Sequence, residues 1–244
     1  MAIRIIMFCL YPQSALNKMT ASDIINRINN IRVPTTEEIP LRQFSAFKSS
    51  EDEIVILYRV HQKVTIPSIE GAQELLVERI FYSKILISEG LLLCYTSSRK
   101  KALEMASFIK DELLGEAGEL VRVEYPDKFL RKLRDDFSLY TTFLRVKAED
   151  PLNQIVLIGK DVTNSQVYKH FRLHRNDILE IEVKPEGIPV EGVFLRFARK
   201  GKLMIKGINE MQSKKYEEIE RRVIALIQKI HGKICPETKL TEFG

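Results

Sequence analysis

Residues 190–207 read VEGVFLRFARKGKLMIKG, and this stretch decides the fold that we expect. Val193, Leu195 and Phe197 lie two residues apart, so they share one face of a strand while the residues between them share the other face. The Lys-Gly-Lys at 200–202 supplies a turn, after which the alternation resumes. The stretch therefore predicts a β-hairpin.

An amphipathic helix is expected directly after this hairpin, over about residues 214–231. Its apolar residues recur at the i, i+3, i+4 and i+7 spacing of a helix that buries one face. They are Ile219, Val223, Leu226, Ile227 and Ile230.

A similar unit occurs earlier, at residues 78–115. Two apolar strands flank Ser88-Glu89-Gly90, a three-residue loop with glycine where positive φ is tolerated. A helix follows, with Ser97 or Ser98 as its cap and Leu103, Ala106 and Leu113 expected to face inward. We therefore predict an α+β fold of duplicated antiparallel β-hairpin-plus-helix units, with sheets covered by helices on one face.

This duplication divides the chain into an N-terminal half, 1–118, and a C-terminal half, 119–244, which carries the basic hairpin. In the first half we expect strands over 3–11 and 54–66, the second ended by Pro67. Thr20 or Ser22 caps a helix between them, and the polar residues 35–53 predict a surface loop.

The composition is that of a soluble globular protein, because 45% of the 244 residues are hydrophobic and 29% are charged. The net charge of +5 favours a polyanionic partner only mildly. No apolar run is long enough for a membrane span, and three scattered cysteines form neither a disulfide framework nor a metal knuckle. We expect an intracellular protein, cytoplasmic or nucleoid-associated, with no cofactor and no membrane partner.

Positive charge gathers on the second hairpin, where five basic residues and no acidic one lie between Val193 and Lys206. A solvated hairpin tip and a phosphate-contacting ribbon both fit this pattern. A second basic group precedes it in the sequence. The candidate nucleic-acid-binding residues are Lys169, Arg172, His174, Arg175, Arg196, Arg199, Lys200, Lys202 and Lys206.

The strongest enzymatic pattern is Asp161 or Asp177 with Glu182 and Lys184. A strand-borne Glu-x-Lys with a preceding Asp is the arrangement of PD-(D/E)xK nucleases, in which the carboxylates share a divalent metal. The alternative is a charged strand face in water. His170 and His174 have the i, i+4 spacing of metal ligands but lack the glutamate base of a zinc hydrolase, so they fit a basic surface better.

Residues 91–107, LLLCYTSSRKKALEMAS, and residues 121–133, VRVEYPDKFLRKL, together resemble the C-terminal region of the kinetochore protein CENP-N. The shared features are an apolar strand ending in Thr-Ser-Ser, a helix with Ala-Leu spacing, a short strand and a Phe-Leu-x-x-Leu helix. This resemblance implies a nonenzymatic adaptor that touches both protein and nucleic acid.

The sequence thus predicts a nonenzymatic nucleic-acid-binding or adaptor subunit of a larger complex, with DNA or RNA and a protein as partners. One alternative is a metal-dependent nuclease that uses Asp161, Glu182 and Lys184. Another is a structural partner protein, such as a separately encoded N-terminal lobe of an Argonaute-like complex.

Overall fold

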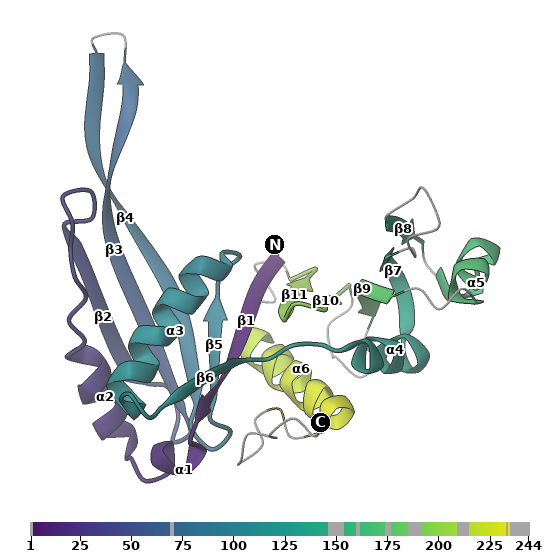
Figure 1. Ribbon diagram of the computed structural model, residues 1–244, viewed down its shortest axis with the longest axis horizontal. Coiled ribbons are helices and arrows are strands. Elements are labelled where there is room, and N and C mark those ends of the chain that lie inside the picture. Colours follow the sequence, from purple (N-terminus) through teal and green to yellow (C-terminus); the bar gives the residue numbers. More distant parts are fainter. Residues whose placement is uncertain are drawn as a thin grey trace. The chain divides into compact units, whose positions relative to one another are not determined.

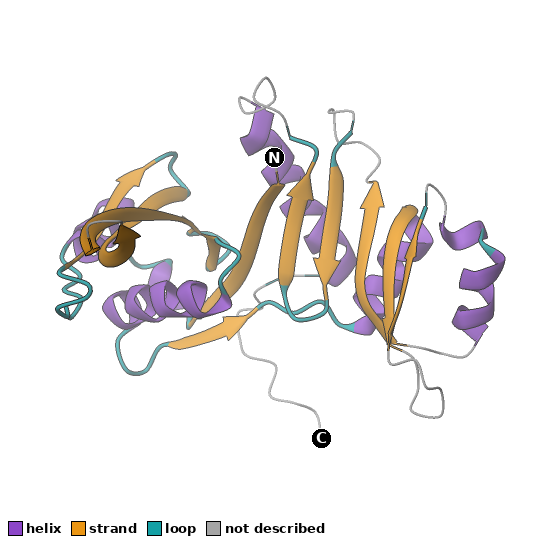
Figure 2. Ribbon diagram, turned by 90° about the horizontal axis from the view of Figure 1, so that it is seen from above, coloured by secondary structure: helices purple, strands orange, loops and turns teal. Residues whose placement is uncertain are grey.

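The computed structural model describes residues 2–68, 71–145, 154–159, 162–173, 177–184, 192–208, 215–232 and 234. It shows a mixed α and β protein whose strands pair antiparallel (Figure 2), which confirms the expected α+β class. In the described part of the chain, no helix is long and apolar enough to cross a membrane.

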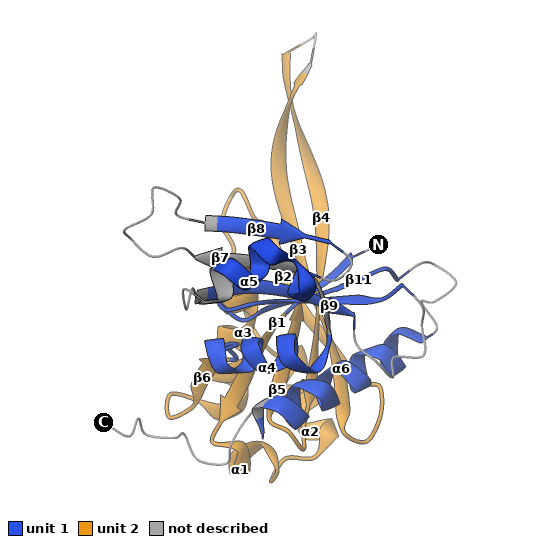
Figure 3. Ribbon diagram, turned by 90° about the vertical axis from the view of Figure 1, so that its right-hand side faces the viewer, with its two compact units in different colours: residues 1–5, 123–234 blue, residues 6–122, 235–244 orange. Residues whose placement is uncertain are grey.

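The chain forms two compact units, coloured separately in Figure 3. Unit 2 takes residues 6–122 of the described chain, and unit 1 takes residues 2–5 with the described residues from 123 to 234. We predicted halves of 1–118 and 119–244. The described residues 119–122 go with unit 2, and the first residues go with unit 1.

Unit 2 is a sheet with the strand order β2-β3-β4-β5-β1, and β6 also pairs with β1 (Figure 1). The strand β1 begins in unit 1 and continues here. The elements are β1 (Ala2–Tyr11), α1 (Gln13–Leu16), α2 (Ala21–Asn29), β2 (Leu41–Lys48), β3 (Glu53–Ser68), β4 (Gly71–Leu86), β5 (Leu91–Tyr95), α3 (Arg99–Leu114) and β6 (Glu119–Arg122).

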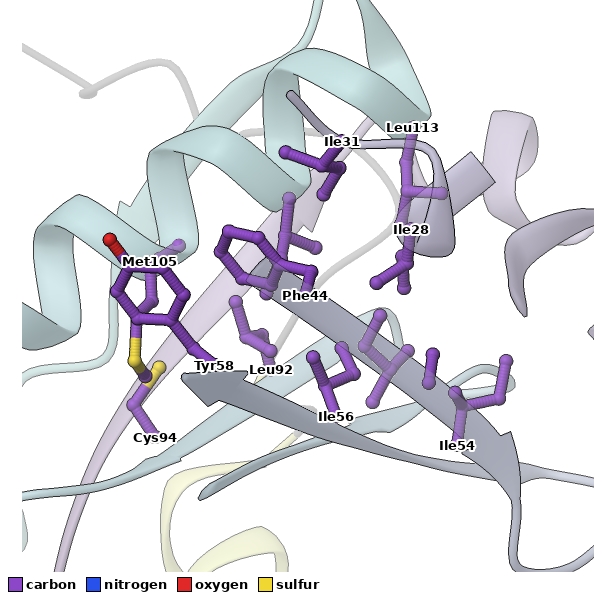
Figure 4. Packing of buried hydrophobic residues seen from close by; sticks show 14 of the residues in the cluster. Ile28, Ile31, Phe44, Ile54, Ile56, Tyr58, Leu92, Cys94, Met105 and Leu113 are labelled. Atoms are coloured by element: carbon purple, nitrogen blue, oxygen red, sulfur yellow. The ribbon is translucent and has the colours of Figure 1, made fainter. Parts of the chain in front are cut away.

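The core of unit 2 lies between this sheet and helices α2 and α3 (Figure 4). Phe44 of β2 stacks on Tyr58 of β3 with ring centroids 4.5 Å apart. The caps lie where the sequence predicts them: Thr20 forms a capping box with Asp23, and the Ser98 hydroxyl accepts from the Lys101 N–H. Local capping therefore fixes where both helices begin.

Three local expectations for unit 2 are wrong. Strand β2 lies in the segment that we expected to be a loop. The sequence did not indicate a strand there because only Phe44 and Ala46 of its side chains are buried and its other residues are polar or exposed. Leu103 is half exposed, since α3 turns Ala102 and Met105 inward instead.

The third error concerns length. Strand β3 continues through Pro67 to Ser68, and β4 begins at Gly71. The two strands pair over 16 residues each without a register shift, from Glu53↔Leu86 to Ser68↔Gly71. Proline ends a central strand but is tolerated where its missing N–H faces an open edge, so Pro67 does not stop this ribbon.

Unit 1 has the strand order β11-β10-β9-β7-β8. Tyr125, Phe129 of α4 and Phe197 of β10 pack together, with ring centroids 5.1 to 5.5 Å apart. Its elements are α4 (Asp127–Asp136), β7 (Ser138–Arg145), β8 (Gln154–Ile158), the 3-10 turn η1 (Val162–Asn164), α5 (Gln166–Leu173), β9 (Asp177–Lys184), β10 (Phe194–Ala198), β11 (Lys202–Lys206) and α6 (Tyr216–His231).

The two units share an order of elements: three consecutive antiparallel strands precede a helix of 16 residues, as β3-β4-β5-α3 and as β9-β10-β11-α6. The strands differ greatly in length, however, and a common order does not show superposable units. The duplication stays a prediction.

Candidate nucleic-acid interface

The hairpin formed by β10 and β11, which we call the basic hairpin (residues 194–206), has one buried and one accessible face. Leu195, Phe197, Leu203 and Ile205 are buried. Arg196, Lys202 and Lys206 lie at alternate positions between them and are half buried. This is the pattern of an antiparallel sheet with one face on the core and one in water.

The turn of the basic hairpin is held by backbone hydrogen bonds on two sides. The Arg199 N–H donates to the Leu179 carbonyl at 2.8 Å, and the Arg199 carbonyl accepts from the Tyr125 N–H at 3.2 Å. Gly201 has φ 76°, a conformation that glycine adopts without steric cost. The turn residues are therefore presented in a fixed geometry.

Two of the five basic side chains form ion pairs with the neighbouring strand β9. Arg196 Nε donates to Glu180 Oε2 at 2.6 Å. Lys206 reaches across β10 to the Glu182 carboxylate. These pairs place a carboxylate beside each of the two cations, and phosphate contacts by the five basic residues stay a prediction.

Lys200 and Lys202 are in a different position. Lys200 at the turn is exposed, Lys202 is half buried opposite Ala198, and within the described residues neither forms an ion pair. The small side chain of Ala198 leaves a hollow of about 140 Å³ between Glu180, Arg196, Lys202 and Met204. The positive charge available at the hairpin is thus concentrated at its tip.

The second predicted basic group is only partly described. Lys169 and His170 are exposed on α5. Arg172 belongs to the same helix, but its side chain lies outside the described set, and so do His174 and Arg175 altogether. Their contribution to the same surface stays a prediction.

The nuclease hypothesis used residues of β9. Glu182 and Lys184 alternate with the buried Ile181 and Val183, so they do share one face of the strand. Glu182 is paired with Lys206, while Asp161 and the Asp177 side chain lie outside the described residues. Over the part of the chain that the structure describes, no group of three or more His, Cys, Asp or Glu side chains forms a metal site.

Two further features were not predicted from the sequence. A charged face of this strand in water was the alternative to the nuclease hypothesis, and in the structure the carboxylates of Glu180 and Glu182 pair with Arg196 and Lys206 of the basic hairpin. A groove of about 610 Å³ also lies beside α4, lined by residues from Pro126 to Asp135 and by Ile230 of α6. Its cations Arg131 and Lys132 pair with Asp127 and Asp136, while Lys128 lines the groove as an exposed cation.

Cys94 in β5 is free and fully buried. Burial raises the pKa of its thiol to about 12. The thiol therefore stays protonated at neutral pH and is a core residue.

No protein-family model matches the chain, and a search among curated proteins finds no match either. The resemblance to CENP-N stays a prediction, carried by segments that correspond to β5 with the first part of α3 and to the end of β6 with α4.

Proposed function

We propose that the chain is a nonenzymatic nucleic-acid-binding subunit and that the tip of the basic hairpin supplies its phosphate contacts. Lys200 and Lys202 make those contacts, with Arg199 between them and β10. Arg196 and Lys206 hold the hairpin against β9 through their ion pairs, and they turn to phosphate only if Glu180 and Glu182 release them.

The observation that carries this proposal is the rigid presentation of unpaired charge. Phosphate contacts from Lys and Arg supply most of the affinity in sequence-independent binding. Backbone bonds from Leu179 and Tyr125 hold the turn, so its backbone need not be ordered when its lysines meet phosphates.

A salt titration tests the proposal. Binding of the full chain to short duplex and single-stranded DNA and RNA is measured by fluorescence anisotropy from low to moderate salt. Each phosphate contact releases counterions, so Lys200→Ala/Lys202→Ala should flatten the slope of log affinity against log salt by about 1 to 2 units. The melting temperature serves as the folding control. Absent binding by the wild type would end the proposal.

The metal-dependent nuclease hypothesis is tested by incubating the same substrates with Mg²⁺ or Mn²⁺. Cleavage that disappears in Glu182→Ala but persists in Glu180→Ala would establish it in place of ours. A purely structural partner protein, such as a lobe of an Argonaute-like complex, is supported if the chain binds none of the nucleic acids and copurifies with a protein.

A further inference from the structure

The long β3–β4 ribbon of unit 2 extends beyond the strands that flank it (Figure 1). Strand β2 pairs with β3 only as far as Leu41↔His61, and β5 pairs with β4 only from Tyr82 onward. We call residues 62–68 and 71–81 the arm. Among the described residues, no strand pairs with the outer edge of β4 between Gly71 and Phe81.

The two edges of the arm differ. On the β3 side, the Lys63 N–H donates to the Glu38 carbonyl at 2.8 Å, so the segment before β2 partly covers that edge. The β4 edge has no proline from Gly71 to Phe81, and its register with β3 is regular. Proteins usually protect an edge strand by proline, by bulges or by a covering segment. The β4 edge carries none of these three, and its protection is limited to the charged side chains Glu74, Glu78 and Arg79.

Apolar side chains flank this edge. Leu75, Leu76 and Ile80 are 47%, 57% and 46% exposed. Of the acidic side chains beside them, Glu74 pairs with Lys63 at 3.9 Å, and Glu78 lies 3.4 Å from His61, which is charged only when protonated. An apolar, nearly neutral edge is suited to pairing with another strand and poorly suited to phosphate.

The sequence of the edge identifies its partner. Residues 73–79 read QELLVER. Three apolar residues lie at the centre, an acidic residue lies on each side of them, and a polar or basic residue lies at each end. This order is nearly the same in both directions. When two identical strands pair antiparallel about a two-fold axis, residue 76 + n of one copy lies opposite residue 76 − n of the other if the axis passes at Leu76.

In that register Leu76 faces Leu76 of the second copy, Leu75 faces Val77, and Arg79 faces Gln73. Glu74 faces Glu78 of the second copy at both ends of this register, a like-charge contact that weakens the pairing and that Lys63, 3.9 Å from Glu74, offsets in part. Apolar residues therefore meet at the centre, and the glutamates lie outside them.

We propose that the β4 edge is a homodimer interface in which the arms of two copies form one four-stranded sheet, β3-β4-β4-β3. Isolated two-stranded ribbons are marginal in water, and a sheet of three or more strands is more stable. Pairing along one strand edge buries less than the roughly 1,200 Å² of a standard interface, so the dimer should be weak and depend on protein concentration. This interface does not depend on nucleic-acid binding.

Sedimentation velocity of the full chain over a wide concentration range tests the proposal. The wild type should change from monomer to dimer as the concentration rises. Leu76→Lys places two like charges directly opposite each other at the axis, so it should weaken the dimer at least about tenfold. Leu103→Lys is the matched control, because Leu103 is 50% exposed on α3 of the same unit and away from the edge. It should leave the dimer unchanged.

A cysteine variant checks the register without adding charge. Residues directly opposite each other in an antiparallel pair have Cα atoms about 4.5 to 5.5 Å apart, within disulfide reach. Under mild oxidation Leu76→Cys should cross-link two copies, and Leu103→Cys should not. A chain that stays monomeric at all concentrations would overturn the proposal. So would a dimer that is insensitive to Leu76→Lys or that cross-links equally through residue 103.

Discussion

The β3–β4 ribbon and the β10–β11 hairpin are built by the same local rules and present opposite chemistries. The basic hairpin is short, rests one face on Phe129 and its neighbours, and keeps five basic residues without an acidic one. The arm is long, exposes apolar residues, and carries Glu74 beside Lys63 and Glu78 beside His61. Burial of one face fixes the basic hairpin, whereas the β3–β4 ribbon leaves one strand edge open. The comparison separates a surface for phosphate from a surface for another strand.

The largest expected difference between the two hairpins is in their contribution to folding. Phe197→Ala removes a fully buried ring from the aromatic group of unit 1 and should lower the free energy of unfolding by about 3 to 5 kcal/mol. Leu76→Ala in the arm removes an exposed side chain and should change it by less than about 0.5 kcal/mol. Urea unfolding followed by circular dichroism at low protein concentration, where the chain is monomeric, measures both. Equal costs would mean that the arm packs within the monomer.

The base of the arm is held by a polar cluster. The Tyr58 hydroxyl donates to Glu104 Oε1 at 3.1 Å, and Lys101 Nζ lies 2.8 Å from Glu104 Oε2. Burial by itself raises the pKa of the Glu104 carboxyl. The bonds and charges of Lys101, Tyr58 and Arg42 outweigh burial and hold this pKa below its usual range.

Glu104→Gln should therefore lower the free energy of unfolding by about 1 to 2 kcal/mol at pH 7, because charged hydrogen bonds are replaced by neutral ones. The folded-state pKa is depressed, so this stabilisation is present above the ordinary carboxyl pKa near 4.5 and is lost as the pH falls through the lower folded value. The advantage of the wild type should shrink accordingly in acid. Glu112→Gln, at an exposed position of the same helix, is the control and should have no such dependence.

A smaller effect is expected when the ion pairs of the basic hairpin are released. Glu180→Gln/Glu182→Gln removes the carboxylates that pair with Arg196 and Lys206, so the slope of log affinity against log salt should steepen by up to about 2 units. Affinity at low salt should rise with it. If these variants leave both quantities unchanged, the sheet face of unit 1 does not meet the nucleic acid and only the tip remains as a contact.

Local signals in the sequence predicted much of the fold. The caps at Thr20 and Ser98 and the turns at Gly90 and Gly201 follow from side-chain and backbone preferences within a few residues. Strand β2 was not predicted because few of its side chains are buried. The full length of the arm was not predicted because we expected Pro67 to end the strand, whereas a proline whose missing N–H faces an open edge does not interrupt it.

The types of residue at the candidate site could be predicted from the sequence, but the ion-pair partners of its cations could not. The pairs of Arg196 with Glu180 and of Lys206 with Glu182 depend on the register of β9 against β10 and β11. Register is set by packing of the whole sheet and cannot be obtained from the charge pattern of one strand.

The most direct test of the account removes equal charge from the basic hairpin and from helix α3. Lys200→Ala/Lys202→Ala takes two positive charges from the basic hairpin, and Arg99→Ala/Lys100→Ala takes two from exposed positions on α3. Both variants have the same net charge, so a general attraction between protein and polyanion changes equally in the two. The loss of a local phosphate contact, in contrast, affects only the variant of the basic hairpin.

The measurement is the salt dependence of binding to one short nucleic acid for the wild type and both variants. We predict that the slope flattens by about 1 to 2 units in the variant of the basic hairpin and stays at the wild-type value in the α3 variant. Equal flattening in both variants, or no flattening in the first, would contradict the assignment of phosphate binding to the basic hairpin.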